Sequence, residues 1–148
     1  MREIHTIILH HTASPPTTTV DTIRRWHMQG NGWSDIGYHY VVRLGEDGHW
    51  TVEKGRPESR TGAHDGGENR GSLGIVVCGD YSEQPLPEYA EIALCALVAS
   101  KCIEYGVPVE RVEGHGEYEP DDTPTRCPGY DMDRVRARVA DHLAAWGG

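Results

Sequence analysis

The sequence predicts an α/β fold in which a central mixed β-sheet is flanked by helices. Two short apolar runs rich in β-branched residues, 4–9 and 73–78, are typical of buried strands. Two longer segments, 87–105 and 131–146, repeat apolar residues at helical spacing. Because helix-length segments separate the groups of strands, we expect the sheet to combine hairpin and crossover connections.

The N-terminal region predicts one strand and one helix. Residues 4–9 form the expected strand, and a pair of prolines that begins at Pro15 forces a loop after it. Residues 21–29 are expected to form a short helix, for which Thr19 or Asp21 is a suitable N-cap.

The middle of the chain predicts three further strands. Residues 38–43 and 49–53 are expected to form a hairpin around the Gly-Glu-Asp-Gly turn at 45–48. Residues 56–72 are polar and rich in glycine, which indicates a loop. The apolar run 73–78 is the fourth strand.

The C-terminal part predicts two helices with a short strand and a loop between them. The first helix covers residues 87–105 and ends at Gly106. A short strand is expected at 111–113, a loop at 115–130 and the last helix at 131–146. The apolar residues that define the first helix are Ala90, Leu94, Leu97, Val98 and Ile103. Those expected on one side of the last helix are Val135, Val139, Leu143 and Trp146.

Chain length and charge limit the possible functions. The 148 residues fit one domain, expected over 1–148. The formal net charge of −9 argues against a nucleic-acid-binding protein. The acidic stretch 117–122 is expected to be a solvated loop rather than a second metal site. No signal peptide or stretch of membrane-spanning length is visible, so we expect a protein made in the cytoplasm and not inserted in a membrane. We also expect a monomer.

Histidine and cysteine side chains offer a candidate metal site. His10 and His11 end the first strand on opposite faces of the sheet, so one of them can face a cleft. His115 begins the later loop, and Cys127 follows 12 positions after it. A thiolate and neutral imidazoles suit zinc, and three protein ligands leave a fourth position for water, as in catalytic zinc sites. From spacing alone, a buried and purely structural Cys127 is the alternative.

The other cysteines and two more histidines are expected to be structural. Cys95 and Cys102 share a face of the first long helix, and Cys78 ends an apolar strand, so all three are expected in the core. His39 is expected in the core or beside the site, and His11 either packs or supports a metal ligand.

Several short motifs resemble those of the N-acetylmuramoyl-L-alanine amidases of the phage lysozyme and peptidoglycan recognition protein superfamily. They occur in the same order from about residue 4 to about residue 135 and cover nearly the whole chain. The motifs are 7–13 (IILHHTA), 26–27 (WH), 32–40 (GWSDIGYHY), 62–64 (GAH), 69–75 (NRGSLGI), 114–115 (GH) and 127–128 (CP).

The resemblance implies a peptidoglycan hydrolase that cleaves the amide between N-acetylmuramic acid and L-alanine in the bacterial cell wall. It implies one zinc ion per chain in a surface cleft, held by the residues that match the family's ligands, His10, His115 and Cys127. Bacterial peptidoglycan is then the expected partner.

The resemblance also implies roles for three further residues. Tyr38 matches a tyrosine that contacts the reacting water. Two residues before the cysteine, the family places a lysine or a threonine that assists at the scissile carbonyl, and Thr125 stands there in this chain. His64, in a glycine-rich loop beside the expected cleft, is predicted either to contact the substrate or to support the loop.

Two differences separate the chain from the cytoplasmic recycling amidases of the superfamily. Those enzymes use an aspartate as third ligand and a glutamate in the fourth strand, whereas this chain has Cys127 and the apolar run 75–77. The resemblance therefore favours the branch of phage lysozymes and recognition proteins, and a small phage-type endolysin in particular.

Three other functions compete with a zinc amidase. A structural zinc protein would need four protein ligands, and the sequence offers three good ones. A peptidoglycan-binding module that does not cut would have lost a zinc ligand, whereas His10, His115 and Cys127 are all present. A cysteine hydrolase would use Cys127 as nucleophile and His115 as base, and insensitivity to chelators would identify it.

Overall fold

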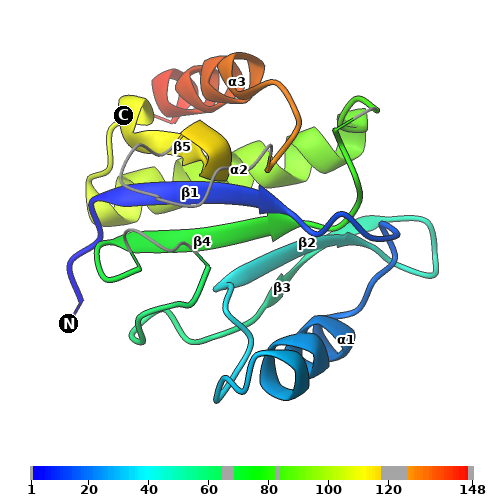
Figure 1. Cartoon of the computed structure of the whole chain (residues 1–148). Helices are drawn as coiled ribbons and strands as arrows, with labels where there is room; N and C mark the ends of the chain where they lie inside the picture. The colour runs from blue at the N-terminus through cyan, green and yellow to red at the C-terminus, as the bar shows by residue number, and fades with distance from the viewer. Residues whose placement is uncertain (1, 65–68, 83, 118–126, 147–148) are drawn as a thin grey trace.

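A five-stranded β-sheet forms the centre of the protein, which we describe from a computed structural model (Figure 1). The structure describes residues 2–64, 69–82, 84–117 and 127–146. In chain order its elements are β1 (Thr6–His11), α1 (Val20–Arg25), the π-helical turn η1 (Trp26–Gly30), β2 (Tyr40–Leu44), β3 (Trp50–Lys54), β4 (Ser72–Val77), α2 (Glu88–Tyr105), η2 (Val109–Arg111), β5 (Val112–Gly114), η3 (His115–Glu117) and α3 (Met132–Ala145).

The sheet is mixed, with the strand order β3-β2-β4-β1-β5. Strands β2 and β3 form an antiparallel hairpin, whereas β2, β4, β1 and β5 pair in parallel. The predicted α/β class and the predicted combination of hairpin and crossover connections are therefore confirmed. The carboxyl ends of the four parallel strands lie at the same end of the sheet. Open α/β sheets bind their ligands at this end.

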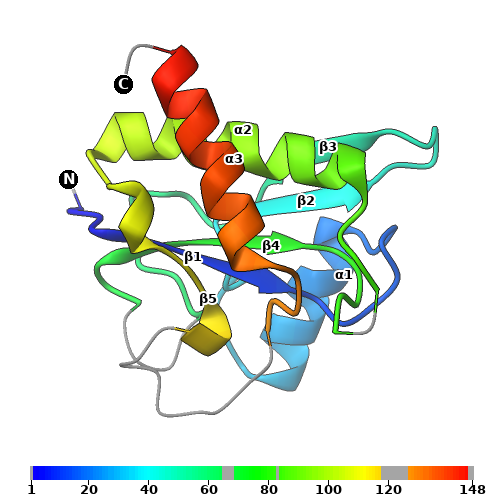
Figure 2. The same cartoon turned by 90° about the horizontal axis from the view of Figure 1, so that it is seen from above.

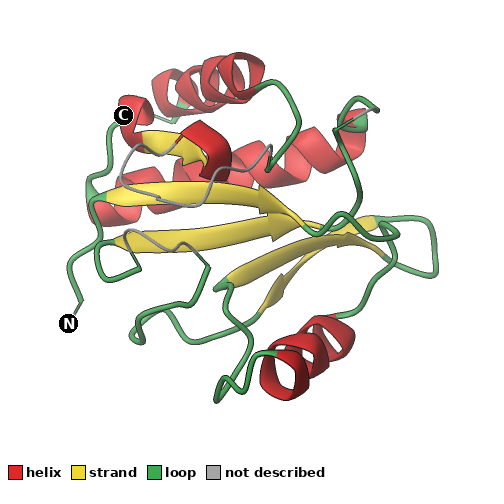
Figure 3. Cartoon of the chain, in the orientation of Figure 1, coloured by secondary structure: helices red, strands yellow, loops and turns green. Residues whose placement is uncertain are grey.

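Helices cover both faces of the sheet (Figures 1 and 3). Helices α2 and α3 lie on one face, and α1 lies on the other, as the view from above also shows (Figure 2). Successive residues of a strand point to opposite faces of the sheet. Ile75 therefore packs in the apolar cluster with α2 and α3, and its neighbour Val76 packs in the cluster with α1.

Most element boundaries lie within two residues of the prediction, and the differences affect the site. Strand β1 continues to His11 because its pairing with β4 runs on to His11 and Val77. The predicted helix 21–29 is an α-helix only as far as Arg25, and Trp26–Gly30 form the π-helical turn. Strand β2 begins at Tyr40, so Tyr38 precedes the strand that was expected to contain it.

The packing of the two long helices leaves two residues of the predicted apolar patterns exposed. On α2 the buried stripe repeats every four residues and reaches Cys102, so Ile103 turns outward and is 51% exposed. Trp146 lies beyond the end of α3 and is 48% exposed. The predicted core cysteines, Cys78, Cys95 and Cys102, are all buried. Among the described residues, no helix combines the length and apolarity that crossing a membrane requires.

Candidate active site

Strand register brings two of the predicted metal ligands together. In the parallel pair of β1 and β5, Leu9 lies beside Gly114, so the next residues along, His10 and His115, follow in step. Their ring centroids are 4.7 Å apart. Two residues far apart in sequence thus meet because each directly follows a paired position at the same end of adjacent strands.

Cys127 completes the group. One potential ligand atom from each of His10, His115 and Cys127 lies within 4.8 Å of the other two. The backbone N–H of His11 donates to Cys127 Sγ over 3.2 Å, which holds the sulfur beside the end of β1. The backbone N–H of Gly116 donates to the Cys127 carbonyl over 2.6 Å, which ties the cysteine to the turn that carries His115.

The chemistry of this donor set fits zinc. Zinc takes imidazole nitrogens and thiolate sulfur, and catalytic sites use three protein ligands with one position open. His10 is 1% exposed, and burial lowers its pKa well below the ordinary value for histidine. The ring is therefore neutral at pH 7 and keeps a lone pair for a metal ion.

Tyr38 lies beside the three candidate ligands. Its ring centroid is 5.1 Å from that of His10. Burial, together with the neighbouring thiols of Cys127 and Cys78, raises the pKa of the Tyr38 hydroxyl above its ordinary value. The hydroxyl therefore stays protonated at neutral pH and can donate a hydrogen bond to a reacting group.

His64 lies behind His10. Its side chain is buried, with 8% of the residue exposed. Nδ1 of His64 is 2.9 Å from Nε2 of His10, and Nε2 of His64 is 3.1 Å from Oγ of Ser72. The predicted contact of His64 with substrate stays a prediction, whereas the contacts described here are with β1 and β4.

His27, for which the sequence predicts no role, lies beside Tyr38 and Trp33. Its ring lies 5.3 Å from that of Tyr38 and 4.8 Å from that of Trp33. The backbone N–H of Gly37 donates to Nδ1 of His27 over 2.8 Å, which leaves the proton on Nε2. Two features indicate a functional role for His27. It belongs to the motif 26–27, and it lies in a π-helical turn, a feature that often marks functional sites.

Three further predicted residues have different outcomes. Thr125 lies outside the described residues. The side chain of His39 is buried as expected, and its Nδ1 accepts from the backbone N–H of Gly74. Nδ1 of His11 accepts from the backbone N–H of Tyr81, so this side chain anchors the loop after β4.

Glu117, the first residue of the predicted acidic stretch, is exposed as expected, and it also forms an ion pair. Both of its carboxylate oxygens pair with the guanidinium of Arg136 on α3, at 2.9 and 3.0 Å. Oε1 also accepts from the backbone N–H of Gly114, the residue before His115. The carboxylate therefore holds the η3 turn against α3. Residues 118–122 of the predicted stretch lie outside the described residues.

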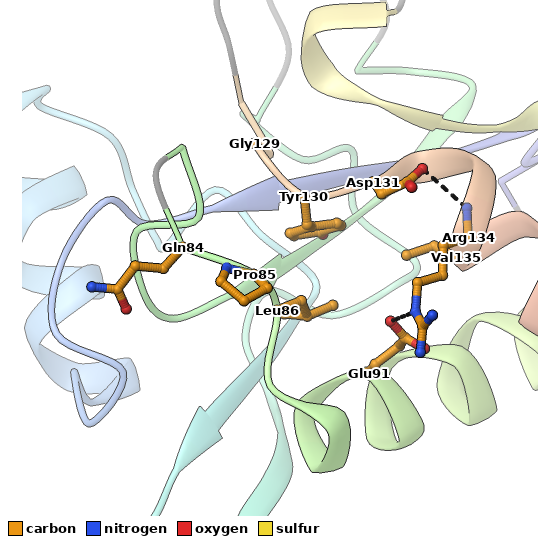
Figure 4. A pocket seen from close by; sticks show the side chains of 9 residues that line it. All are labelled: Gln84, Pro85, Leu86, Glu91, Gly129, Tyr130, Asp131, Arg134 and Val135. Carbon is orange, nitrogen blue, oxygen red and sulfur yellow. Dashed lines mark hydrogen bonds and ion pairs between the residues drawn. The ribbon is translucent and has the colours of Figure 1, made fainter.

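Two hollows flank the segment that follows Cys127. One of about 220 Å³ is lined by Cys127 itself and by η3 residues, which places the cysteine at the rim of a cleft. The other, of about 400 Å³, lies on the far side of Tyr130 (Figure 4). The Tyr130 hydroxyl donates to the His10 carbonyl over 3.3 Å, and Glu91 and Arg134 pair on the opposite wall.

Comparison with known proteins agrees with this geometry. The chain is similar to the endolysin of Klebsiella phage KP32, with 31% identity over 135 residues that cover 90% of this chain and 85% of the phage protein. It is similar to peptidoglycan-recognition protein SC2 of Drosophila melanogaster, with 31% identity over 132 residues that cover 84% and 68% of the two chains. It also resembles the structure of the N-acetylmuramoyl-L-alanine amidase LysC from Clostridium intestinale URNW, with a TM-score of 0.80, 29% identity, and coverage of 94% and 87%. Residues 1–130 match the family described as N-acetylmuramoyl-L-alanine amidase, and the chain belongs to that family.

Proposed function

We propose that the chain is a zinc-dependent, phage-type endolysin, a single catalytic domain over residues 1–148 that hydrolyses the amide between N-acetylmuramic acid and L-alanine. The amidase activity and the peptidoglycan substrate follow from the family. The observation that carries the zinc dependence is the group formed by His10, His115 and Cys127, whose ligand atoms lie within 4.8 Å of one another.

The residues of the cleft divide the work of amide hydrolysis. When bound, a zinc ion polarises the scissile carbonyl and activates water for attack. Tyr38, whose hydroxyl stays protonated, orients the attacking water and passes a proton. Thr125 donates a hydrogen bond to the oxygen of that carbonyl as negative charge develops on it. This role for Thr125 rests on its position two residues before Cys127.

Binding of the wall depends on the shape of the cleft rather than on charge. The formal net charge of −9 gives no attraction to an anionic bacterial surface. The rings of His27 and Trp33, beside Tyr38, offer flat surfaces on which a sugar ring can pack. We expect the protein to act on the cell wall as a monomer.

Recognition of peptidoglycan without hydrolysis is the second candidate. The similarity to a recognition protein favours it, and the complete group of ligand residues favours catalysis. A zinc amidase purified without chelator should contain about one zinc per chain. It should release the free amino group of L-alanine from purified walls and leave the glycan strands intact.

Chelation should abolish this release, and added zinc should restore it. Binding to walls without release of amino groups would establish the recognition function instead. New reducing sugar ends would indicate a glycosidase, which normally requires two facing carboxylates. Full activity in a metal-free preparation would overturn the zinc proposal.

A further inference from the structure

The His64 ring packs directly against two glycines, Gly62 and Gly74. A side chain at Gly74, in the middle of β4, would place its Cβ 2.4 Å from Cγ of His64. A side chain at Gly62 would place its Cβ 2.7 Å from Cδ2 of the same ring. Glycine inside a strand weakens it and often marks a close approach. The space that these two glycines leave empty is filled by one imidazole.

Contacts on three sides fix the orientation of this ring. The backbone N–H of His64 donates to Oδ1 of Asn69 over 3.0 Å, which ties the His64 backbone to that side chain. The ring of His39 packs edge-on at 5.8 Å. The two ring nitrogens of His64 point to His10 and to Ser72, as described above. A side chain that served the loop alone would not need both nitrogens engaged in the interior.

The hydrogen-bonded series His10–His64–Ser72 allows two arrangements of its protons. In the first, Nε2–H of His10 donates to Nδ1 of His64, and Nε2–H of His64 donates to Oγ of Ser72. This arrangement leaves the Nδ1 lone pair of His10 free for a metal ion. In the second, every proton is reversed, and Nδ1 of His10 carries a hydrogen that blocks ligation. The partner of the second ring nitrogen therefore decides whether a histidine can bind metal.

We propose that His64 is a positioning residue that holds His10 in the Nε2–H tautomer and aims its Nδ1 at the metal. The inference rests on the proposed function for the identity of the metal. It assigns His64 a role through His10 rather than through contact with the substrate. The test therefore separates loss of metal affinity from loss of substrate binding.

Three variants test the role through zinc affinity, measured by competition with a chromophoric chelator. His64→Leu removes the acceptor for His10 and should weaken zinc binding by about 10- to 100-fold, the usual effect of losing such a partner. His64→Asn places a carbonyl oxygen near the position of Nδ1 and should recover most of the affinity. Val98→Ala, in the core under α2, is the control: it should lower stability without changing zinc affinity.

The tautomer gives a readout that a merely structural role would not change. In long-range ¹H–¹⁵N spectra of the metal-free protein, His10 should carry its proton on Nε2 in the wild type and show a mixture of tautomers in His64→Leu. Ser72→Ala removes the hydroxyl that contacts Nε2 of His64 and should produce a smaller fraction of the second His10 tautomer. The wild-type spectrum tests the proton arrangement even where His64→Leu does not fold.

The outcomes distinguish this inference from the proposed function. A wild-type protein that binds no zinc refutes the zinc dependence, whereas the tautomer of His10 is still measured. Zinc affinity that is equal in the wild type and His64→Leu refutes the positioning role and leaves the zinc amidase intact. A His10 ring protonated on Nδ1 in the wild type also refutes it. Unchanged zinc affinity with a raised KM in His64→Leu would instead establish contact with substrate.

Discussion

At the scale of single residues, three candidate ligands from separate segments of the chain meet at one point. His10, His115 and Cys127 were expected from their donor atoms and from matching motifs, and the fold brings them together. The contact between His10 and His64 joins residues 54 positions apart. It depends on the absence of a side chain at Gly62 and Gly74, where a Cβ would clash with the His64 ring. No local pattern encodes such a contact, because it arises only when β1, β4 and the intervening loop pack.

Replacing Tyr38 with phenylalanine should separate catalysis from folding. The variant loses one hydroxyl and keeps the ring beside His10, so zinc content and the urea midpoint should not change. Turnover on purified walls should fall by about 100-fold or more, as expected for loss of a proton-transfer group. Tyr89→Phe, at a residue 75% exposed on α2, should retain full activity. Parent turnover in Tyr38→Phe would mean that the hydroxyl has no catalytic role.

Cys127 tests the distinction between a metal ligand and a nucleophile. Aspartate can bind zinc through oxygen but cannot form a thioester, so Cys127→Asp should keep some zinc and some amidase activity. In the wild type, iodoacetamide should label Cys127 only after chelation, because the metal occupies the sulfur lone pair. Rapid labelling of the zinc-loaded enzyme, with activity insensitive to chelator, would establish a cysteine hydrolase.

At the scale of secondary-structure elements, periodicity predicted which elements exist, and pairing set where they end. The apolar run that predicts β1 stops at Leu9, and the strand continues through the two histidines expected at its end because β4 supplies partners up to Val77. The prediction for α2 included Ile103, whereas a stripe repeating every four residues turned that side chain to solvent. Partners across the sheet are absent from any local window of sequence.

The η3 turn should depend on one ion pair with α3. Arg136 pairs with Glu117 and also donates to the Val112 carbonyl, so it fixes the backbone on both sides of His115. Arg136→Gln should cost up to about 1 kcal/mol of stability, since the pair is partly exposed. It should also weaken zinc binding.

Arg138 provides the matched control on the same helix. It pairs with Glu88 and Glu91, away from η3. Arg138→Gln should lower the free energy of unfolding by a similar amount and leave zinc affinity at the wild-type value. Equal zinc affinity in the two variants, measured beside urea unfolding, would show that the ion pair with Glu117 does not support the site.

At the scale of the whole molecule, Glu58 connects segments that are distant in sequence. Its carboxylate accepts hydrogen bonds from Tyr40 on β2 and from Lys101 and Tyr105 on α2. Its backbone carbonyl accepts from Arg2 near the N-terminus. Burial alone would raise the pKa of this carboxyl, but the three hydrogen bonds outweigh it and hold the pKa below the ordinary value.

This lowered pKa gives the protein a predictable acid sensitivity. Because the folded pKa is depressed, Glu58 contributes stability above the ordinary glutamate pKa of about 4.3, and the contribution disappears as pH falls through the folded value. Glu58→Gln should therefore cost about 1.5–3 kcal/mol at pH 7 and progressively less in acid. Glu46→Gln, at an exposed turn, should follow the wild-type curve of urea stability against pH. A constant difference between Glu58→Gln and wild type at all pH values would contradict this assignment.

The ion pair at η3 has a second consequence, which concerns solubility. Strand β5 is the last strand of the sheet, and an uncovered edge strand invites another chain to extend the sheet. Here the Val112 carbonyl is occupied by Arg136, and the Gly114 N–H is occupied by Glu117. Two charged side chains thus take the place that a strand from a second copy would need. The turn that presents His115 and the resistance of this edge to aggregation depend on the same two residues.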